Sequence, residues 1–209
     1  MAVYNAAKCK VCRRVGDKLF LKGERCNTVK CALTRRAYPP GHLGKNARVR
    51  LTEYGSQLRE KQKVRKTYGV LERQFVKYLN EAVGIKGNTA EILLNMLEFR
   101  LDNIIYRSGL GSSRSEARLL VNHDHFNVNG KKVNIPSYRV KVGDLVSIQE
   151  KSKKKNYFKN IAEVLKQKEA PSWLAFNKEK MEIKIMAAPS LQEAGLSADI
   201  KQVIEFYSR

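Results

Sequence analysis

Long apolar segments are missing from this chain of 209 residues. No uninterrupted apolar run approaches the roughly 18 residues of a transmembrane helix. The first residues, MAVYNAAKCK, lack the apolar centre of a signal peptide and the Ser- and Arg-rich amphipathic character of a transit peptide. Neither a lipidation motif nor a basic amphipathic helix with a bulky apolar face is evident. We therefore expect a cytoplasmic protein.

Acidic residues are scarce relative to basic ones. The chain has 41 Lys and Arg against 20 Asp and Glu, which gives a net charge of +21 and an isoelectric point near 10.0. Residues 1–70 hold 18 of the basic residues and only 4 acidic ones, so one third of the chain carries two thirds of the excess charge. A folded protein this basic repels itself unless an acidic partner compensates, and nucleic-acid phosphate is the usual partner.

Side-chain arrangements typical of enzymes are also absent from the sequence. It has only 3 histidines, and no Ser/His/Asp or Cys/His arrangement or glycine-rich phosphate loop is apparent. His42 has no serine or cysteine partner nearby, so a role in the surrounding linker is favoured over catalysis. Asp102 lies inside an expected helix, where an ion pair with a neighbouring arginine is the expected role. We therefore expect that the chain is not an enzyme.

The only four cysteines form two close pairs near the N-terminus. The pairs are Cys9-x2-Cys12 and Cys26-x4-Cys31, separated by 13 residues, and this spacing is typical of structural zinc sites. A bound ion would replace the apolar core that a polar segment of about 40 residues cannot build. An iron–sulfur cluster on the same four thiolates is the alternative, whereas disulfides are unusual in the cytoplasm. We predict zinc bound by these four cysteines.

The segment from Lys45 to Lys66 is the densest basic run. Thr52 is placed to cap a helix, and Gly69 is expected to interrupt that helix before a second one starts at Val70. Such a run is usually a solvated helix face. Here, however, few acidic residues lie four positions away to pair with the basic ones, so we favour an RNA-binding face.

Residues 100–148 have the pattern of two short helices, a hairpin and one more strand. Apolar residues three and four apart predict a helix that ends near Gly109. Ser113 starts the S-x-x-E spacing of a capping box, which predicts a second helix. Asn129-Gly130 between alternating residues predicts a tight hairpin, and Gly143 turns the chain into the last strand. The pattern predicts a small, mostly antiparallel sheet packed with helices.

The remaining elements are expected to complete these regions. They are a helix capped by Thr89, a basic loop at Lys151 to Lys155, a helix around Ile161, strands at 173–176 and 181–185 that enlarge the sheet, and a C-terminal helix capped by Ser197.

Several motifs in residues 100–148 carry a resemblance to a known family. In order, R-L-D-N, R-S-G, S-x-x-E-A-R, V-N-H, V-N-G, P-S-Y and G-D-L-V resemble the RNA-binding module named after small-subunit ribosomal protein S-four. The string E-K-Q-K-V-R-K-T-Y-G-V-L-E-R-Q-F and the ending V-I-E-F-Y-S-R extend the resemblance to the bacterial-type S-four family as a whole, with its zinc-type N-terminus.

The resemblance implies a fold and a function. The fold would be α+β, with a four-cysteine metal knuckle and Pro/Gly linker at 1–44, a basic helical domain at 45–90 completed by a helix at 197–209, and an inserted module at 91–196. The function would be that of a structural constituent of the small ribosomal subunit that binds the five-prime domain of 16S ribosomal RNA during assembly. The chain would contact ribosomal proteins S-three and S-five near the mRNA entrance and contribute to translational accuracy.

Basic side chains are the candidate RNA contacts. Double-helical RNA hides its base edges from side chains, so we expect recognition of phosphate positions rather than of bases. A zinc-dependent DNA-binding protein would instead need a recognition helix after the cysteines, where this chain has Pro39-Pro40-Gly41. The candidates are Arg13, Arg14, Arg35, Arg36, Lys45, Arg48, Arg50, Lys61, Lys63, Arg65, Lys66, Arg100, Arg107, Arg114 and Arg118.

Overall fold

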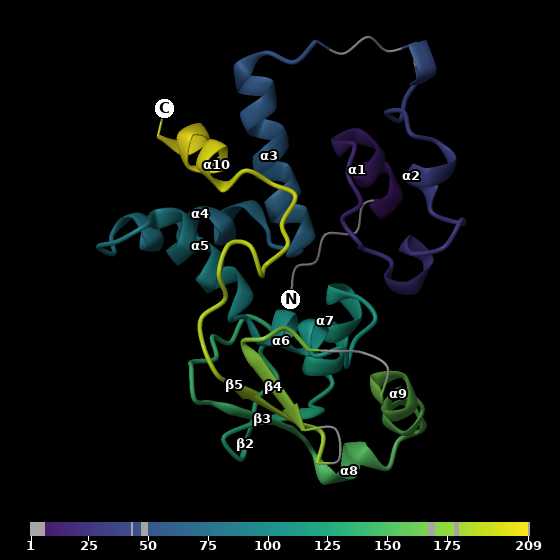
Figure 1. Cartoon of the computed structure of the whole chain (residues 1–209), viewed down its shortest axis with the longest axis vertical. Helices are drawn as coiled ribbons and strands as arrows, with labels where there is room; N and C mark the ends of the chain where they lie inside the picture. Colours follow the sequence, from purple (N-terminus) through teal and green to yellow (C-terminus); the bar gives the residue numbers. More distant parts are fainter. Residues whose placement is uncertain (1–6, 43, 47–49, 167–169, 178–179, 209) are drawn as a thin grey trace. The chain divides into compact units, whose positions relative to one another are not determined.

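The computed structural model describes residues 7–42, 44–46, 50–166, 170–177 and 180–208 and divides the chain into two compact units (Figure 1). One unit consists of residues 1–93 and 195–209, and the other of residues 94–194. Among the described residues, no helix has the length and apolarity needed to span a bilayer.

The first unit begins with a small segment that has little apolar core. It contains α1 (Lys8–Val15), the 3-10 turn η1 (Gly23–Cys26), α2 (Ala32–Arg35) and the 3-10 turn η2 (Gly44–Asn46). Gly16 ends α1 with a φ of 89°, and its N–H donates to the Cys12 carbonyl. The buried apolar residues of this segment are Cys12, Val15, Leu19 and Cys31.

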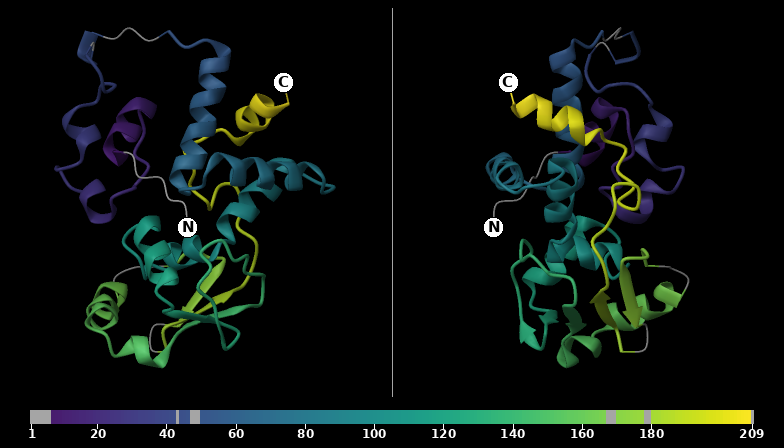
Figure 2. Two further views of the ribbon diagram at one scale, coloured as in Figure 1. Left: turned by 180° about the vertical axis from the view of Figure 1, so that it is seen from behind. Right: turned by 60° about the vertical axis from the view of Figure 1, so that its left-hand side comes forward.

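Three helices form the larger part of this unit. They are α3 (Glu53–Thr67), α4 (Glu72–Val83) and α10 (Ile200–Tyr207). Thr52 caps α3, as predicted, by accepting a hydrogen bond from the Gly55 N–H. Gly69 then turns the chain with a φ of 64°, a conformation that glycine adopts without strain. The final helix, α10, packs against α3 (Figures 1 and 2), and Ser56 donates to the Gln202 side chain at 3.2 Å.

The second unit combines helices with one antiparallel sheet. The chain enters it along α5 (Thr89–Glu98), and α6 (Leu101–Arg107), α7 (Arg114–Asn122), α8 (Glu150–Lys153) and α9 (Asn156–Lys166) are its other helices. The strands are β1 (Phe126–Val128), β2 (Lys131–Lys132), β3 (Leu145–Ile148), β4 (Leu174–Asn177) and β5 (Glu182–Ile185), in the order β2-β1-β3-β5-β4. The predicted antiparallel sheet and its enlargement by the two late strands are confirmed.

The core of the second unit joins the sheet to α6 and α7. Ile104 and Ile105 of α6, Val121 of α7, Phe126 of β1 and Val146 of β3 are all fully buried. The hairpin between β1 and β2 turns at Asn129 and Gly130, whose φ values of 50° and 77° are those of the tight turn that the Asn-Gly pair predicts. Ser113 caps α7 as expected, but Glu116 accepts from the Ser112 N–H, so the capping box is only half formed.

Three local predictions were wrong. Asn88 rather than Thr89 caps α5, because its side chain accepts the Ala90 N–H at 3.1 Å. Asp199 rather than Ser197 caps α10, by accepting the Lys201 N–H. In both cases an Asn or Asp side chain, which caps at least as well as Thr, lay within two residues. The expected loop at 151–155 begins instead with the helix α8, which a hydrogen bond between Ser152 and His125 fixes to the core.

A charged group lies at the contact between α3, α4 and α10. Lys61 is 6% exposed, and its Nζ lies 2.8 Å from Glu72 Oε1 and 4.6 Å from the centre of the Phe206 ring. Tyr207 donates its hydroxyl to the same Glu72 oxygen at 2.6 Å, and Arg65 lies 2.7 Å from the other. Burial alone would raise the pKa of Glu72, but the hydrogen bonds from Lys61 and Tyr207 hold this pKa below its ordinary value.

Because the pKa of Glu72 is lowered in the folded state, its ionisation stabilises the fold above the unfolded pKa, and this contribution is lost as the pH falls through the folded pKa. We expect Glu72→Gln to lower the free energy of unfolding at neutral pH by about 1–3 kcal/mol, since it leaves the buried Lys61 without its counterion. Urea unfolding at neutral and acidic pH measures both effects.

The matched control is Glu24→Gln, which changes an exposed glutamate of η1 in the same unit. This variant should keep the wild-type stability and its acid dependence. If the free energy of unfolding fell equally with acid in Glu72→Gln and in the wild type, ionisation of Glu72 would not be the source of the pH dependence.

Candidate nucleic-acid interface

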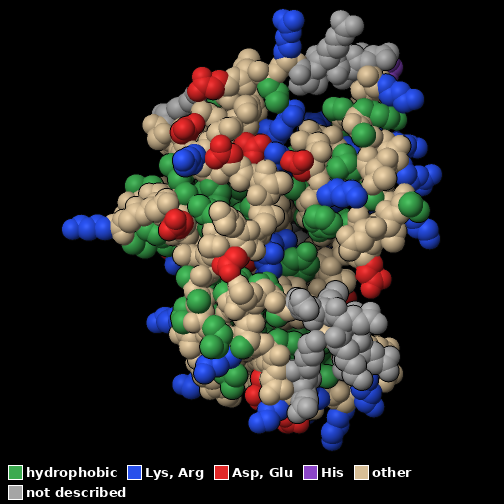
Figure 3. Space-filling view, in the orientation of Figure 1, with side chains coloured by type: hydrophobic (Ala, Val, Ile, Leu, Met, Phe, Trp, Pro, Cys, Tyr) green, Lys and Arg blue, Asp and Glu red, His purple; other side chains and the backbone are tan. Residues whose placement is uncertain are grey.

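Exposed basic side chains gather over the α1–α2 segment. Figure 3 shows Lys and Arg side chains projecting from this part of the surface. The predicted residues that are exposed here and just before α3 are Arg14, Arg35, Arg36, Lys45 and Arg50. Sequence reasoning did not select four more exposed residues of the same segment, Lys10, Lys18, Lys22 and Lys30, although the charge excess of residues 1–70 could have indicated them.

Arg13 differs from its neighbour Arg14. It lies over the Tyr38 ring, with its guanidinium carbon 4.8 Å from the ring centre, and Nε donates to the Tyr38 carbonyl at 3.0 Å. A terminal nitrogen also donates to the Pro39 carbonyl. Arg13 therefore holds the Pro/Gly linker against α1. Arg48 lies outside the described residues.

Three of the basic residues of α3 are paired with carboxylates. Lys61 and Arg65 share Glu72. The Nζ of Lys63 lies 2.7 Å from a carboxylate oxygen of both Asp17 and Glu60, so it ties α3 to the turn after α1. Asp17 and Glu72 were not visible as helix neighbours because they lie outside α3, whereas Glu60 lies three residues before Lys63 on the same helix.

Lys66 is the half-buried basic residue at the end of α3. Burial, together with the nearby Arg65 charge, lowers the pKa of Lys66 to about 8. Its ammonium group is therefore easier to neutralise near neutral pH than that of an exposed lysine.

In the second unit, Arg100 is buried rather than exposed. It is 2% exposed, and its guanidinium contacts both carboxylate oxygens of Asp102, at 3.1 and 2.8 Å. The expected ion pair of Asp102 with a neighbouring arginine is confirmed. A buried pair of this geometry fixes the start of α6 and leaves the Arg100 side chain inside the fold.

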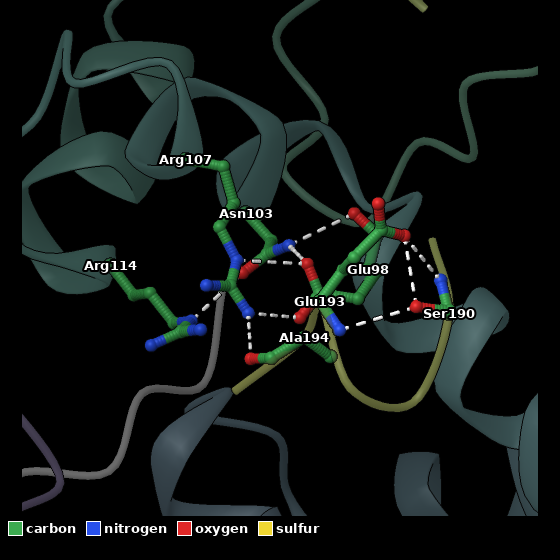
Figure 4. A network of polar contacts seen from close by, with 7 residues as sticks. All are labelled: Glu98, Asn103, Arg107, Arg114, Ser190, Glu193 and Ala194. Atoms are coloured by element: carbon green, nitrogen blue, oxygen red, sulfur yellow. Dashed lines mark hydrogen bonds and ion pairs between the residues drawn. The ribbon is translucent and has the colours of Figure 1, made fainter. Parts of the chain in front are cut away.

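Three further arginines lie on α6 and α7. Arg107 contacts Glu98, Arg114 donates to Asn103, and Arg118 is half-buried (Figure 4 shows the first two). Arg114 and Arg118 are one turn apart on α7, as predicted. Exposed lysines that the prediction did not rank follow on β2 and around α8 and α9. They are Lys131, Lys132, Lys151, Lys154, Lys155 and Lys159.

The four cysteines line one cavity in the first unit. Cys9, Cys12, Cys26 and Cys31 are all free thiols and surround a cavity of about 20 Å³, which is room for one water-sized guest. The Lys22 N–H donates to Cys26 Sγ at 3.4 Å. Burial raises the pKa of Cys12, whereas a hydrogen bond from the Thr34 backbone lowers the pKa of Cys31.

These thiols have the chemistry of a metal-binding site, because cysteine sulfurs are soft donors and those of both pairs line the same small cavity. In the described part of the chain, however, no group of three or more His, Cys, Asp or Glu side chains is arranged to hold a metal ion. The four cysteines therefore fit a zinc ion by their chemical type and their shared location. The predicted metal knuckle is not confirmed.

Comparisons with known proteins cover the whole chain. Residues 3–98 match the family described as Ribosomal protein S4/S9 N-terminal domain, and residues 99–146 match the S4 domain. The small ribosomal subunit protein uS4 of Acetivibrio thermocellus is 51% identical over 209 residues, which is 100% of both chains. The uS4 protein of Halothermothrix orenii is 49% identical and the uS4A protein of Alkaliphilus metalliredigens 52% identical, again over 100% of both chains. The chain therefore belongs to the uS4 family, whose members are structural proteins of the small ribosomal subunit and not enzymes.

Proposed function

We propose that this chain, as a structural protein of the small ribosomal subunit, binds the five-prime domain of 16S ribosomal RNA and acts early in subunit assembly. The observation that carries the proposal is the set of exposed basic side chains over α1, α2 and the linker. Their charge meets solvent, whereas Lys61, Lys63 and Arg65 of α3 are already paired with carboxylates.

The two groups of basic residues have different proposed roles. Arg14, Arg35, Arg36, Lys45 and Arg50 contact phosphates directly, and arginine does so with two parallel hydrogen bonds where the geometry allows. Arg48, which lies outside the described residues, is proposed to contact phosphate because of its position in the basic run from Lys45 to Lys66. The paired Lys61, Lys63 and Arg65 hold α3 in place, and Arg13 holds the linker. Recognition then depends on the shape of the folded RNA, not on base edges.

Finer features follow the family resemblance. The regions 1–44, 45–90 with 197–209, and 91–196 act as a metal knuckle, a helical platform and an RNA-binding module. The chain contacts ribosomal proteins S-three and S-five and lies near the mRNA entrance, where it contributes to translational accuracy. The exposed basic side chains of both units support these contacts through their charge.

Zinc is the proposed ion of the four-cysteine cavity. Cys9, Cys12, Cys26 and Cys31 would hold it, and it would supply a structural crosslink between the two cysteine pairs. Among the described residues of this segment, the buried apolar ones are Val15, Leu19 and two of the cysteines, and a core this small supports a need for such a crosslink. An iron–sulfur cluster is the alternative with the same ligands.

For RNA binding, we expect the native five-prime domain to be bound more tightly than a shuffled RNA of equal length in filter binding over a salt series. Arg35→Ala should lower the slope of log affinity against log salt by ~1, because one phosphate contact is lost. Lys61→Met is the control. It removes a paired, buried charge, so it should lower stability and leave the slope unchanged.

Equal affinity for native and shuffled RNA would reject the proposed target. Equal binding of duplex DNA at matched salt would favour a DNA-binding protein instead. An unchanged slope in Arg35→Ala would remove Arg35 from the interface.

For the metal, we expect the purified chain to contain about one zinc ion per molecule, measured by elemental analysis. Cys12→Ser should lose this zinc, and chelation should lower the melting temperature of the wild type but not of Cys12→Ser. Stoichiometric iron and sulfide with visible absorption would replace zinc by a cluster, and a metal-free chain of wild-type stability would reject both.

A further inference from the structure

A fully buried carboxylate lies at the end of α5. Glu98 is 0% exposed, and Arg107 of α6 contacts both of its oxygens, with Nη2 at 2.6 Å from Oε1 and Nε at 3.0 Å from Oε2 (Figure 4). Asn103 donates a third hydrogen bond, from Nδ2 to Oε2 at 2.7 Å. A buried charge of this kind is tolerated only with such partners, so Glu98 fixes the positions of both side chains.

Asn103 has its amide orientation set by this carboxylate. The side chain is 1% exposed, and Nδ2 donates both to the Glu98 carboxylate and to the Glu98 carbonyl at 2.9 Å. Both of these atoms are acceptors, so only the NH₂ end of the amide can face them. The oxygen end must therefore point the other way, and there Oδ1 accepts a hydrogen bond from Arg114 Nε at 2.8 Å.

Two of the contacts made by the Arg114 guanidinium bear on its orientation. Besides the hydrogen bond to Asn103, its central carbon lies 4.4 Å from the centre of the Tyr106 ring. The ring contact and the hydrogen bond from Nε together restrict the positions that the guanidinium can take. In Figure 4 the Arg114 guanidinium lies beyond Asn103 as seen from Glu98, at the margin of the network.

Arg107 is the fixed end of the network. Its Nη2 also donates to the Ala194 carbonyl at 2.6 Å. Residues 190–194 form a turn in which the Glu193 carboxylate accepts from the Ser190 N–H and hydroxyl. Arg107 therefore binds Glu98 and this turn, which both belong to the second unit. The contacts run from Arg107 through Glu98 and Asn103 to Arg114, which is the other end of the network.

From this geometry we propose that Asn103 is a positioning residue for RNA binding, which transmits the fixed position of Glu98 to Arg114 and so holds the Arg114 guanidinium ready for a phosphate. The inference rests on the proposed binding of ribosomal RNA and specifies how one contact of that interface is built. Because the guanidinium is oriented before RNA arrives, less side-chain freedom is lost on binding.

The test is a double-mutant cycle on affinity for the five-prime domain of 16S ribosomal RNA. Asn103→Ala and Arg114→Ala should each weaken binding about fivefold to tenfold, and the double variant should be no weaker than Arg114→Ala alone. Asn103→Ala combined with Arg35→Ala should instead show multiplied losses, because Arg35 lies in the other unit. A purely structural role of Asn103 would give multiplied losses in both pairs.

A second variant covers the case in which Asn103→Ala fails to fold. Arg114→Lys keeps the charge but not the Nε donor, so its salt slope should match the wild type while its affinity falls about fivefold. Affinity within about twofold of the wild type would overturn the proposal.

The cycle also separates this inference from the proposed function. If Arg114→Ala binds normally while Arg35→Ala is impaired, the positioning role is rejected and the RNA-binding function stands. If native and shuffled RNA bind equally in the wild type, the proposed function itself fails.

Discussion

The pairing of buried basic side chains with a few carboxylates is the constraint on which this structure depends. An ammonium or guanidinium group removed from water requires a nearby counterion, and the chain has only 20 acidic residues to offer. Glu72 serves two cations at the α3–α10 contact, and Glu98 holds Arg107 in the second unit. Basic residues that have such partners position helices, while those over α1 and α2 remain at the surface.

Sequence reasoning was most successful where the signal is local. Gly69 and the Asn129-Gly130 pair were located correctly, because a positive φ selects glycine or asparagine whatever packs around it. The errors concern choices between neighbours of similar propensity, such as Asn88 and Thr89 at the start of α5. The helix α8 was missed because its docking depends on His125, 27 residues away from Ser152 in the sequence.

The candidate site could be predicted by composition but not residue by residue. Arg13 and Arg14 are adjacent and chemically identical, yet one is stacked on Tyr38 and the other is exposed. Similarly, Glu72 and Asp17, which pair with Lys61 and Lys63, lie outside α3, so a search for partners four residues away could not find them. The spacing of the cysteines did predict that they would share one location, and they line one cavity.

The division of the first unit along the sequence has a consequence for synthesis of the chain. Residues 195–209 belong to that unit, and their helix supplies Phe206 and Tyr207, whose rings cover Lys61. Residues 94–194 are complete before this helix has been made. N-terminal domains of a growing chain generally fold first, but this unit needs residues from both ends of its sequence. The Lys61–Glu72 pair of α3 and α4 can be covered by Phe206 and Tyr207 only after these two residues have been made.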